Sequence, residues 1–549
     1  MRVIIIGAVA AGTSAAAKAR RNSEDIEIAI YDKDSFISYS GCGMPYYIGG
    51  EVENINELIP RDPEFFKKKY NVDIFIQHEV LSINTLEKKL EIKNLTTGNM
   101  IEDHYDKLII ATGAASMVLP ISGADNINVF TLRNITDMNH IKSYISQNQP
   151  KTAAIIGTGF IGLEVCENLK NMGIEVTLIE KLPQVTPGLD SDMALYVRDC
   201  LVKNGVRVIL EASISNITEE GVSLSNGEFI NAQMVLIAAG VKPVTDLAKK
   251  AGVELGITGA IKTDQKMETN LKDIYACGDC VEQFHIVTEK PVYRPLGSTA
   301  NKTGRIAGDQ VTGGKLTFRG ILGTGIFKIF QMTVAQTGLT EKEARANGYD
   351  IVICHNIKPN KPEYMEGKEM VIKAVADKKD GRLLGVQIIG YEGVDKRIDV
   401  FVTAITYKAK VEDLFHLDLA YAPPFSTTKD PVMYTGMILD NAISGGRPLI
   451  TATELGLLME SDESYTLIDV RTKEQYEKGH IENAINIPHK KIRETAAELN
   501  KEIKVITYCN KGVTGNAAQN ILINYGFEHV FNLSGGYKQF TKIKGENLK

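Results

Sequence analysis

The sequence predicts an α/β protein with two doubly wound parallel sheets, an α+β segment after them and a smaller α/β domain last. The first observation is an order of elements repeated in residues 2–32 and 152–180: an apolar strand, a Gly-rich turn, a helix and a second strand ending in an acid. The second is that residues 320–445 mix short strands with a helical stretch and contain no such turn. The third is a turn-forming segment, 444–448, after which α/β alternation begins again.

Length and composition indicate a multidomain globular protein. The 549 residues exceed what one hydrophobic core usually holds, so we expect roughly three or four domains. A net charge of -6 gives no general attraction for nucleic acid or for an anionic membrane, and no apolar run is long enough to span a bilayer. The seven cysteines are scattered and odd in number, which does not suggest a disulfide framework. We therefore expect a cytoplasmic protein with small-molecule ligands.

The second Gly-rich turn matches a dinucleotide-binding pattern in full. Residues 157–162 read Gly-Thr-Gly-Phe-Ile-Gly directly after an apolar strand, with glycines at Gly157, Gly159 and Gly162. Glycines permit the tight turn and let the backbone approach a pyrophosphate at the helix N-terminus. Glu180 ends the next strand, where a carboxylate accepts from the ribose hydroxyls of NAD and repels the extra phosphate of NADP. We expect NADH as the reductant.

The first Gly-rich turn departs from the pattern at one position. Gly7 and Gly12 are in place, but Val9 stands where the middle glycine is usual, and Asp32 ends the following strand. The carboxylate and the two outer glycines still predict a dinucleotide site.

Two distant segments indicate that this first site holds a flavin. Residues 106–113, which end in Ala111, Thr112 and Gly113, and residues 274–279, which end in Gly278 and Asp279, look like the flavin motifs of disulfide reductases with two dinucleotide domains. This order of motifs implies an FAD domain with the NAD domain inserted in it.

Two candidates exist for a redox thiol. Cys277 and Cys280 form a Cys-x-x-Cys pair, but Asp279 between them belongs to the flavin motif, so these thiols are not expected to face the reactive edge of the flavin. Cys42 follows the Asp32 strand after a short loop and has no partner cysteine nearby in the sequence. We expect Cys42 to do the chemistry.

Three long segments, residues 42–47, 393–399 and 419–431, resemble the coenzyme A disulfide reductases, in the form that is fused to a rhodanese domain. The resemblance extends over essentially the whole chain. It implies that Cys42 forms a mixed disulfide with coenzyme A, and that Tyr364 and Tyr421 reach in from the second subunit of a homodimer.

The resemblance also implies further contacts and the domain boundaries. Additional cofactor contacts are Lys33, Val80 and Gly240. Contacts to coenzyme A, whose phosphates require cations, are Ser14, Lys18, Arg21, Ser38, Asn301 and Lys429. The expected domains are FAD-binding (1–115 and 241–320), NAD-binding (116–240), dimerisation (321–445), a linker (446–453) and rhodanese (454–549).

The last domain contains a second candidate nucleophile. Residues 467–488 resemble the entry motif of rhodanese domains, and Cys509 stands between a strand and a helix. A thiolate in such a loop lies in a cradle of backbone N–H groups that lowers its pKa and can hold a persulfide. Thr514 occupies the position of a usual Arg, for which Lys511 can substitute electrostatically, and His480 is expected to be structural.

The predicted activity is reduction of coenzyme A persulfide, polysulfide or coenzyme A disulfide by NADH and FAD, with sulfane sulfur carried on Cys509 and sulfide released. An NADH oxidase or peroxidase is the first alternative. That branch has a His in the first Gly-rich turn, whereas Ala10 and Ala11 stand here. A sulfur-relay or redox-sensing protein is the second alternative. No metal site is predicted.

Overall fold

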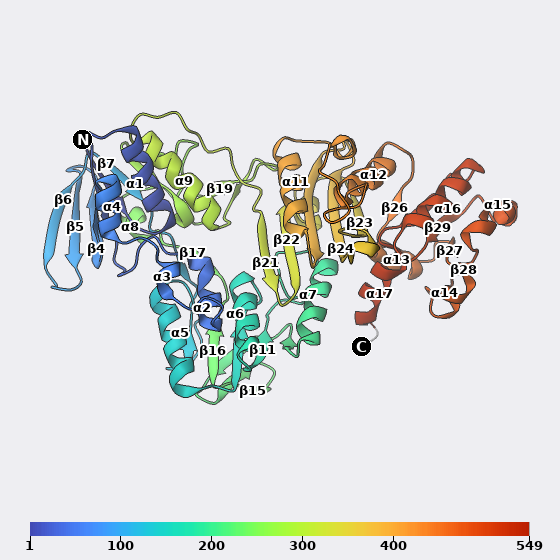
Figure 1. Cartoon of the computed structure of the whole chain (residues 1–549), viewed down its shortest axis with the longest axis horizontal. Helices are drawn as coiled ribbons and strands as arrows, with labels where there is room; N and C mark the ends of the chain where they lie inside the picture. Colours follow the sequence, from blue (N-terminus) through green and yellow to red (C-terminus); the bar gives the residue numbers. More distant parts are fainter. Residues whose placement is uncertain (548–549) are drawn as a thin grey trace. The chain divides into compact units, whose positions relative to one another are not determined.

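The computed structural model describes residues 1–547 and groups them into two compact units. The first consists of Met1–Pro183 and Gly205–Gly323, and the second of Gln184–Asn204 and the chain from Thr324 onward. Colour follows the sequence in Figure 1. No helix of residues 1–547 is long and apolar enough to cross a membrane.

The first unit contains both predicted parallel sheets. One has the strand order β18-β7-β1-β2-β3 and the other β12-β11-β10-β16-β9, and every pairing within them is parallel. The strands of the first sheet are β1 (Arg2–Ile6), β2 (Glu27–Tyr31), β3 (Asp73–Phe75), β7 (Lys107–Ile110) and β18 (Ile274–Ala276), and those of the second are β9 (Val129–Phe130), β10 (Thr152–Ile156), β11 (Glu175–Ile179), β12 (Arg207–Ile209) and β16 (Met234–Ile237). The central strands are apolar on both faces, as a sheet covered on both sides requires.

Smaller elements complete the first unit. The helices are α1 (Ala10–Asn22), α2 (Met44–Gly49), α3 (Ile55–Leu58), α4 (Pro63–Tyr70), α5 (Ile135–Asn148), α6 (Phe160–Asn171), α8 (Asp246–Lys250) and α9 (Gly297–Gln310), with single turns η1 (Gly41–Gly43) and η2 (Gly278–Cys280). The remaining strands are β4 (His78–Asn84), β5 (Lys89–Asn94), β6 (Met100–His104), β8 (Ala114–Ser116), β13 (Ile214–Ile217), β14 (Gly221–Leu224), β15 (Phe229–Asn231), β17 (Val241–Pro243), β19 (Gln283–Phe284) and β20 (Pro291–Val292).

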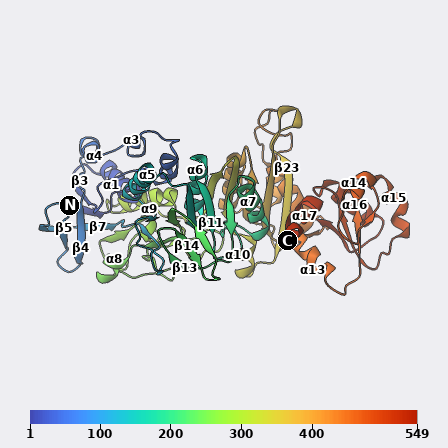
Figure 2. The same cartoon turned by 90° about the horizontal axis from the view of Figure 1, so that it is seen from below.

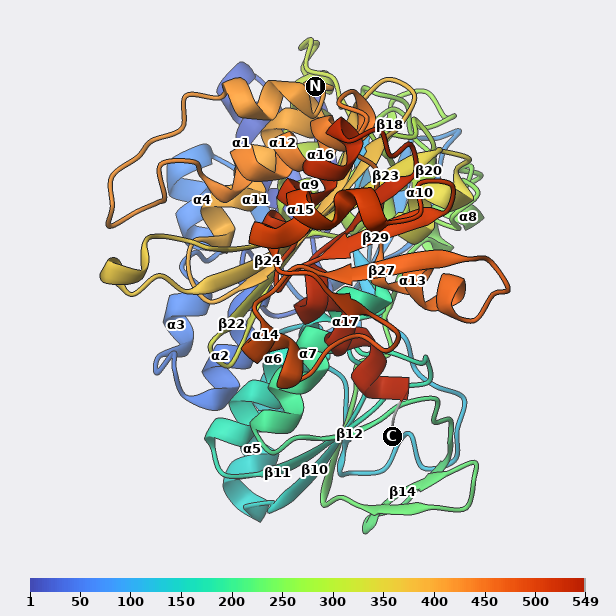
Figure 3. The same cartoon turned by 90° about the vertical axis from the view of Figure 1, so that its right-hand side faces the viewer.

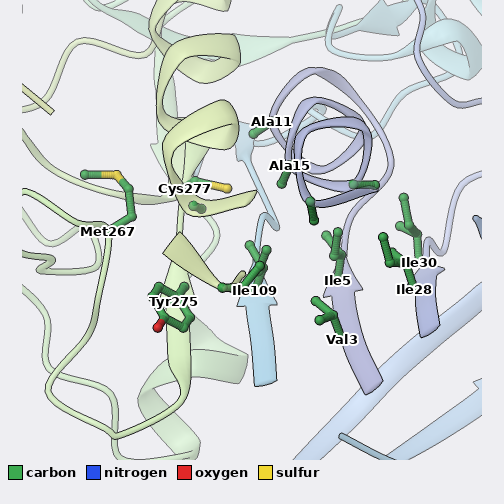
Figure 4. Close-up of a cluster of buried hydrophobic side chains, with 14 of the residues drawn as sticks. Val3, Ile5, Ala11, Ala15, Ile28, Ile30, Ile109, Met267, Tyr275 and Cys277 are labelled. Carbon is green, nitrogen blue, oxygen red and sulfur yellow. The ribbon is translucent and has the colours of Figure 1, made fainter. Parts of the chain in front are cut away.

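Helices α1 and α9 pack closely over the first sheet. Figure 4 shows Ala11 and Ala15 of α1 above the strands that carry Ile5 and Ile109. A Cβ on Gly304 of α9 would overlap the backbone of Ala11, and other residues of α9 are equally close to α1. Small residues therefore set the distance between two helices that each carry part of the predicted flavin site.

The second unit begins with an antiparallel sheet of order β21-β22-β25-β24-β23. Its strands are β21 (Gly325–Ile329), β22 (Met332–Gly338), β23 (Ile351–Pro359), β24 (Glu369–Asp377) and β25 (Leu383–Gly390), and its helices are α10 (Glu341–Ala346), α11 (Val394–Thr406) and α12 (Pro431–Ile443), with η3 (Glu363–Met365) and η4 (Glu412–His416). This arrangement fits the predicted α+β segment.

Helix α7 (Ser191–Lys203) also packs on this antiparallel sheet (Figure 1), although in the sequence it lies between two strands of the second parallel sheet. Its apolar face, with Met193, Val197 and Leu201, is buried. The range predicted for the NAD-binding domain, 116–240, thus includes a helix that the structure groups with the second unit.

The last sheet is parallel, with order β26-β30-β29-β27-β28. Its elements are β26 (Leu449–Ile450), α13 (Ala452–Met459), β27 (Tyr465–Asp469), α14 (Lys473–Glu477), β28 (Ile485–Asn486), η5 (His489–Lys491), α15 (Ile492–Thr495), η6 (Ala496–Glu498), β29 (Lys504–Tyr508), α16 (Val513–Asn524), β30 (Val530–Leu533) and α17 (Gly536–Asn547). Figure 3 shows α15 and α16 on one side of the sheet and α17 on the other. A separate hydrophobic core lies on each side. Strand β26 and the start of α13 fall in the range predicted as a linker, 446–453. The α/β class is confirmed.

Candidate active site

The first Gly-rich turn joins β1 to α1 and is held by Asp32. The Ala8 amide donates to the Asp32 carboxylate at 2.6 Å. Gly7 has φ +108°, and a Cβ on it would overlap the carbonyl oxygen of Ala111; a Cβ on Gly12 would overlap the carbonyl oxygen of Gly7. Both glycines are therefore required by the fold of the turn itself. The turn fits the N-terminal phosphate site of a dinucleotide.

The two predicted flavin motifs meet this turn from other strands. The Gly278 amide donates to Thr303 Oγ1 of α9 at 3.0 Å, and Gly278 has φ +82°. Arg133, which follows β9 of the second sheet, holds the second flavin motif, since its Nη2 lies 2.8 Å from Asp279 Oδ2. Thr112 Oγ1 donates to the Val244 carbonyl at 2.7 Å.

The second Gly-rich turn has the same construction. Thr158 donates to Glu180 Oε2 through its amide, at 3.0 Å, and through its hydroxyl, at 2.7 Å. A Cβ on Gly162 would overlap the Gly157 carbonyl oxygen, whereas a Cβ on Gly159 would meet nothing within 4 Å. Val9, at the corresponding place in the first turn, is half-buried. The turn fits an NAD pyrophosphate.

The predicted redox thiol lies where the first parallel domain contacts a helix of the second. Cys42 is in η1, immediately before α2, and is exposed. Helix α2 packs on α6 so closely that a Cβ on Gly49 would overlap the Asn168 side chain. This packing places the Cys42 loop beside the helix that follows the second Gly-rich turn. One thiol is thus accessible at the junction of the two dinucleotide domains.

Desolvation and Glu164, a carboxylate of α6, raise the pKa of the Cys42 thiol. Although Cys42 is exposed, neighbouring protein atoms partly desolvate its thiol, and this desolvation, assisted by the charge of Glu164, raises the pKa of the thiol, while Arg133 opposes the shift. Burial, with the repulsion of Glu167, raises the pKa of Glu164 to about 7. Burial and Glu164 also raise the pKa of Tyr46 to about 12. Glu164 can therefore exchange a proton near neutral pH beside the thiol.

The Cys-x-x-Cys pair is in a different environment. Cys277 and Cys280 are fully buried, and Cys280 Sγ donates to the Cys277 carbonyl at 3.2 Å. Burial raises the pKa of both thiols. Such thiols are poor nucleophiles.

Of the coenzyme A contacts predicted in the first unit, two contact each other and two have other partners. Ser14 Oγ donates to Asn301 Oδ1 at 2.6 Å, so these two predicted residues lie together. Lys18 Nζ lies 3.0 Å from Asp309 Oδ1, and Arg21 Nη2 donates to the Tyr70 hydroxyl at 3.2 Å. The Lys18 charge is thus matched by a carboxylate that the sequence did not indicate.

Other predicted residues of this unit occupy backbone positions or ordinary contacts. The Ser38 amide donates to the Ala8 carbonyl at 2.9 Å, which ties the Cys42 loop to the first turn. Lys33 Nζ lies 4.0 Å from Glu79 Oε1. Val80 is buried, Gly113 has φ +70° and Gly240 has φ +106°.

The predicted tyrosines lie in the second unit. Tyr364 in η3 is 74% exposed and Tyr421, in the segment before α12, is 49% exposed. Arg397, which is buried, holds the end of that segment: its Nη2 lies 2.9 Å from Asp430 Oδ2 and 2.9 Å from the Asn360 carbonyl. Two large aromatic side chains are thus presented to solvent from anchored segments.

The predicted sulfur carrier, Cys509, follows β29 and is 7% exposed. Its carbonyl accepts from the Tyr537 amide at 2.8 Å. Gly512, with φ +94°, turns the loop into α16, and Lys511 pairs with Glu369 of β24. His480 stacks on Tyr476, with ring centroids 3.8 Å apart, as a structural residue would.

Sequence reasoning missed several residues that complete the site. These are Arg133, Glu164, Thr303 and Gly304. Glu164 stands two residues after Gly162, within the predicted strand–turn–helix unit of residues 152–180, whereas the other three meet their partners only where segments distant in the sequence pack together.

Comparison with known proteins identifies the domains. Residues 1–303 match the pyridine nucleotide-disulphide oxidoreductase family, residues 325–431 match its dimerisation domain and residues 451–543 match the rhodanese-like domain. The predicted sequence of domain types is confirmed.

Curated relatives are similar in sequence to most of this chain. An "NADH oxidase" of Methanocaldococcus jannaschii is 37% identical over 79% of this chain and 97% of its own length. A CoA-dependent "NAD(P)H sulfur oxidoreductase" of Pyrococcus furiosus is 35% identical over 80% of this chain and 99% of its own. A "Coenzyme A disulfide reductase" of Staphylococcus haemolyticus is 33% identical over 79% of this chain and 98% of its own.

Solved structures extend the similarity to the last domain. Reduced Bacillus anthracis CoADR-RHD has a TM-score of 0.97 and 37% identity over 99% of this chain and 98% of that one. A NAD-dependent persulfide reductase from A. fulgidus has a TM-score of 0.90 and 35% identity over 98% of this chain and 100% of that one. The chain therefore belongs to the pyridine nucleotide-disulphide oxidoreductase family, whose members use FAD and NAD(P)H, and carries a rhodanese-like domain after the dimerisation domain.

Proposed function

We propose that this enzyme uses NADH to reduce the sulfur–sulfur bond of coenzyme A persulfide, polysulfide or coenzyme A disulfide. The observation that carries the proposal is the single exposed thiol, Cys42, at the junction of two dinucleotide-binding domains, while Cys277 and Cys280 are buried. The names of the Pyrococcus and Staphylococcus relatives and of the persulfide reductase structure support it.

The first Gly-rich turn, with Gly7, Gly12 and Asp32, would hold FAD, which would supply electrons from NADH for reduction of a sulfur–sulfur bond at Cys42. The Cys42 thiolate attacks the inner sulfur of a coenzyme A persulfide, forming a mixed disulfide and releasing hydrosulfide. Two electrons and a proton then return the Cys42 thiolate and free coenzyme A thiol. Glu164, with its pKa near 7, holds or releases the proton beside this sulfur.

The dimer and the tyrosines are part of the same proposal. We assign the dimerisation domain to a homodimer in which Tyr364 and Tyr421 of one subunit protonate or stabilise the leaving sulfur at Cys42 of the other. Their large exposed fractions, 74% and 49%, support a role outside their own subunit. Ser14 and Asn301, which lie together, and Lys18 and Arg21 contact coenzyme A. A cytoplasmic location fits seven cysteines without a disulfide bond.

The decisive experiment is Cys42→Ser, assayed as NADH oxidation with coenzyme A disulfide, coenzyme A persulfide and polysulfide. We expect loss of at least about a thousandfold in kcat with each substrate, because the nucleophile is absent. Cys200→Ser, at a half-buried thiol of the second unit, is the control and keeps its activity. Full activity of the Cys42 variant would exclude the assignment.

The Methanocaldococcus relative, named NADH oxidase, makes oxygen reduction the second candidate. Faster NADH oxidation with oxygen or peroxide alone than with any sulfur substrate would favour it. The side chains of Ala10 and Ala11 supply no proton donor in the first turn, which favours the sulfur substrate.

A further inference from the structure

Three lysines meet around the Cys509 loop, and two of them come from the dimerisation domain. Lys358 is on β23, Lys429 lies two residues before α12, and Lys511 lies two residues after Cys509 in the rhodanese-like domain. We call these three the lysine cluster. They belong to the same compact unit.

Contacts with one aromatic ring place the first two lysines. Lys358 Nζ lies 4.1 Å and Lys429 Nζ 6.0 Å from the ring centroid of Tyr434 on α12. Helix α12 is fixed to β23 because Asn356 Nδ2 donates to the Pro431 carbonyl at 2.9 Å. The two ammonium groups are therefore held at one end of β23.

Lys511 reaches the same end of the sheet from the other domain. It pairs with Glu369, which also pairs with Lys538 of α17. Glu369 is opposite Pro359 in the β23–β24 register, next to Lys358. The Cys509 loop thus contacts the strand end where Lys358 lies.

A buried polar network fixes this arrangement. His355, three residues before Lys358, accepts a hydrogen bond from, or donates one to, Ser534 at 3.1 Å and Asp192 at 2.6 Å. Asp192 in turn pairs with Lys373 at 2.9 Å. Ser534 lies two residues before α17, and Figure 2 shows the last domain, which contains α17, next to the sheet that contains β23. Breaking such a buried network costs free energy, so it holds the dimerisation domain and the rhodanese-like domain in a fixed position relative to each other.

Charge is not balanced in the cluster. Glu369 faces Lys511 and Lys538, and within residues 1–547 no carboxylate pairs with Lys358 or Lys429. Burial, followed by repulsion from Lys511, lowers the pKa of Lys358, whereas the nearby Cys509 raises it and Lys429 lowers it further. Lys358 is half-buried and Lys429 is exposed, and neighbouring cations that lack a carboxylate partner favour binding of an anion from solution.

We propose that the lysine cluster and Cys509 form one composite site for a small dianionic sulfane-sulfur donor of the thiosulfate type. The anionic end binds the ammonium groups of Lys358, Lys429 and Lys511, and the outer sulfur faces Cys509. This assigns Lys429 to the sulfur donor instead of to the coenzyme A contact that the resemblance implies. The dimerisation domain thereby replaces the cation that is absent at Thr514.

The transfer step balances without another reagent. The Cys509 thiolate attacks the outer sulfur of thiosulfate, the S–S bond of the donor breaks, and sulfite leaves with the bonding electron pair. Cys509 becomes a persulfide anion. The three negative charges before the step, two on the donor and one on the thiolate, remain three after it.

The test is transfer of sulfur from thiosulfate to cyanide by the holoenzyme, which requires no NADH. Lys358→Met with Lys429→Met is expected to raise the KM for thiosulfate at least about tenfold, with kcat changed less than about threefold, because two ammonium groups are lost from the site. Sulfate should inhibit the parent competitively and lose this effect in the double variant.

The matched control is Lys378→Met. Lys378 follows β24 at the opposite end of the same sheet and pairs with Asp350. An unchanged KM in the double variant, or an equal rise in the control, would overturn the composite site. If the double variant lost sulfur transfer from coenzyme A persulfide but kept transfer from thiosulfate, the lysine cluster would bind the phosphates of coenzyme A. That result would also overturn the composite site.

Two further measurements separate other causes of failure. The proposal rests on the prediction that Cys509 carries sulfane sulfur as a persulfide, so Cys509→Ser must abolish transfer from thiosulfate; retained transfer would refute that prediction instead. The second measurement is the rate of alkylation of Cys509, followed by mass spectrometry, with anionic iodoacetate and with neutral iodoacetamide. The ratio of the iodoacetate rate to the iodoacetamide rate should be higher in the parent than in the double variant. Equal ratios would contradict the cationic site even if a variant were partly misfolded.

Discussion

Gly304→Ala tests whether the spacing of α1 and α9 organises the flavin site. The added Cβ would overlap the carbonyl oxygen of Ala11 and lie 2.9 Å from its carbonyl carbon and Cα. Carbon atoms in contact are normally about 3.5–4.0 Å apart, so the helices must separate by roughly 1 Å. Helix α1 follows the first Gly-rich turn and α9 supplies Thr303 to Gly278, so the separation shifts the two flavin motifs relative to each other.

Two opposing effects determine how much Gly304→Ala changes the free energy of unfolding. Overpacking costs about 3 kcal/mol, at the upper end of the usual range because backbone meets Cβ. The greater helix propensity of Ala over Gly returns about 1 kcal/mol. Gly297→Ala, in the same helix but with nothing within 4 Å of its Cβ, has only the second term. The two variants should differ by about 3 kcal/mol, or roughly 6–12 °C in Tm.

The assay compares both variants by thermal unfolding and by the absorbance of bound flavin. We expect Gly304→Ala to melt below the parent and to retain less FAD after gel filtration, and Gly297→Ala to match or exceed the parent in both. Equal Tm and flavin content in the two variants would refute the inference that the α1–α9 contact sets the geometry of the site.

The remaining predictions concern charged side chains. Glu164→Gln should lower the pKa of Cys42 and speed its alkylation by iodoacetamide at pH 8, but much less at pH 6, where Glu164 is already protonated; an unchanged pH profile would contradict their coupling. Glu180→Gln should reduce the preference for NADH over NADPH in kcat/KM by about 10- to 100-fold, and an unaltered ratio would exclude the ribose contact. Lys373→Met, which removes a 2% exposed cation 2.9 Å from Asp192, should cost about 3–5 kcal/mol in thermal unfolding. Because Lys373 lowers the pKa of Asp192, the parent loses the stability of this paired carboxylate as the pH falls below the usual range of an aspartate, whereas the variant loses less. The difference in stability between parent and variant should therefore narrow on acidification, and parallel pH curves would refute this.

The glycine turns were predictable because their chemistry is local. Gly12 and Gly162 are required by contacts with Gly7 and Gly157 in the same turn, and the carboxylates of the following strands hold those turns as their spacing indicated. The order of the flavin motifs similarly predicted a sheet assembled from distant strands, because the pattern of apolar runs fixes which segments become parallel strands.

Contacts between helices were not predictable from spacing. Glu164 meets Cys42 only because α2 packs on α6, and Lys18 is matched by Asp309, which lies 291 positions later in the sequence. The lysine cluster likewise requires the docking of two domains. Single-residue patterns contain no information on such pairs, since a charged residue on a helix surface has the same sequence signature whether it is paired or free.

The placement of α7 has a consequence for any cleavage of the chain. The backbone leaves the first unit after Pro183, returns at Gly205 and leaves again after Gly323. A protease that cuts between Gly323 and Thr324 therefore produces two polypeptides that remain associated, because the N-terminal one still contributes α7 to the other's apolar core. Conversely, a polypeptide that ends at Gly323 carries the uncovered side chains of Met193, Val197 and Leu201, and is expected to aggregate.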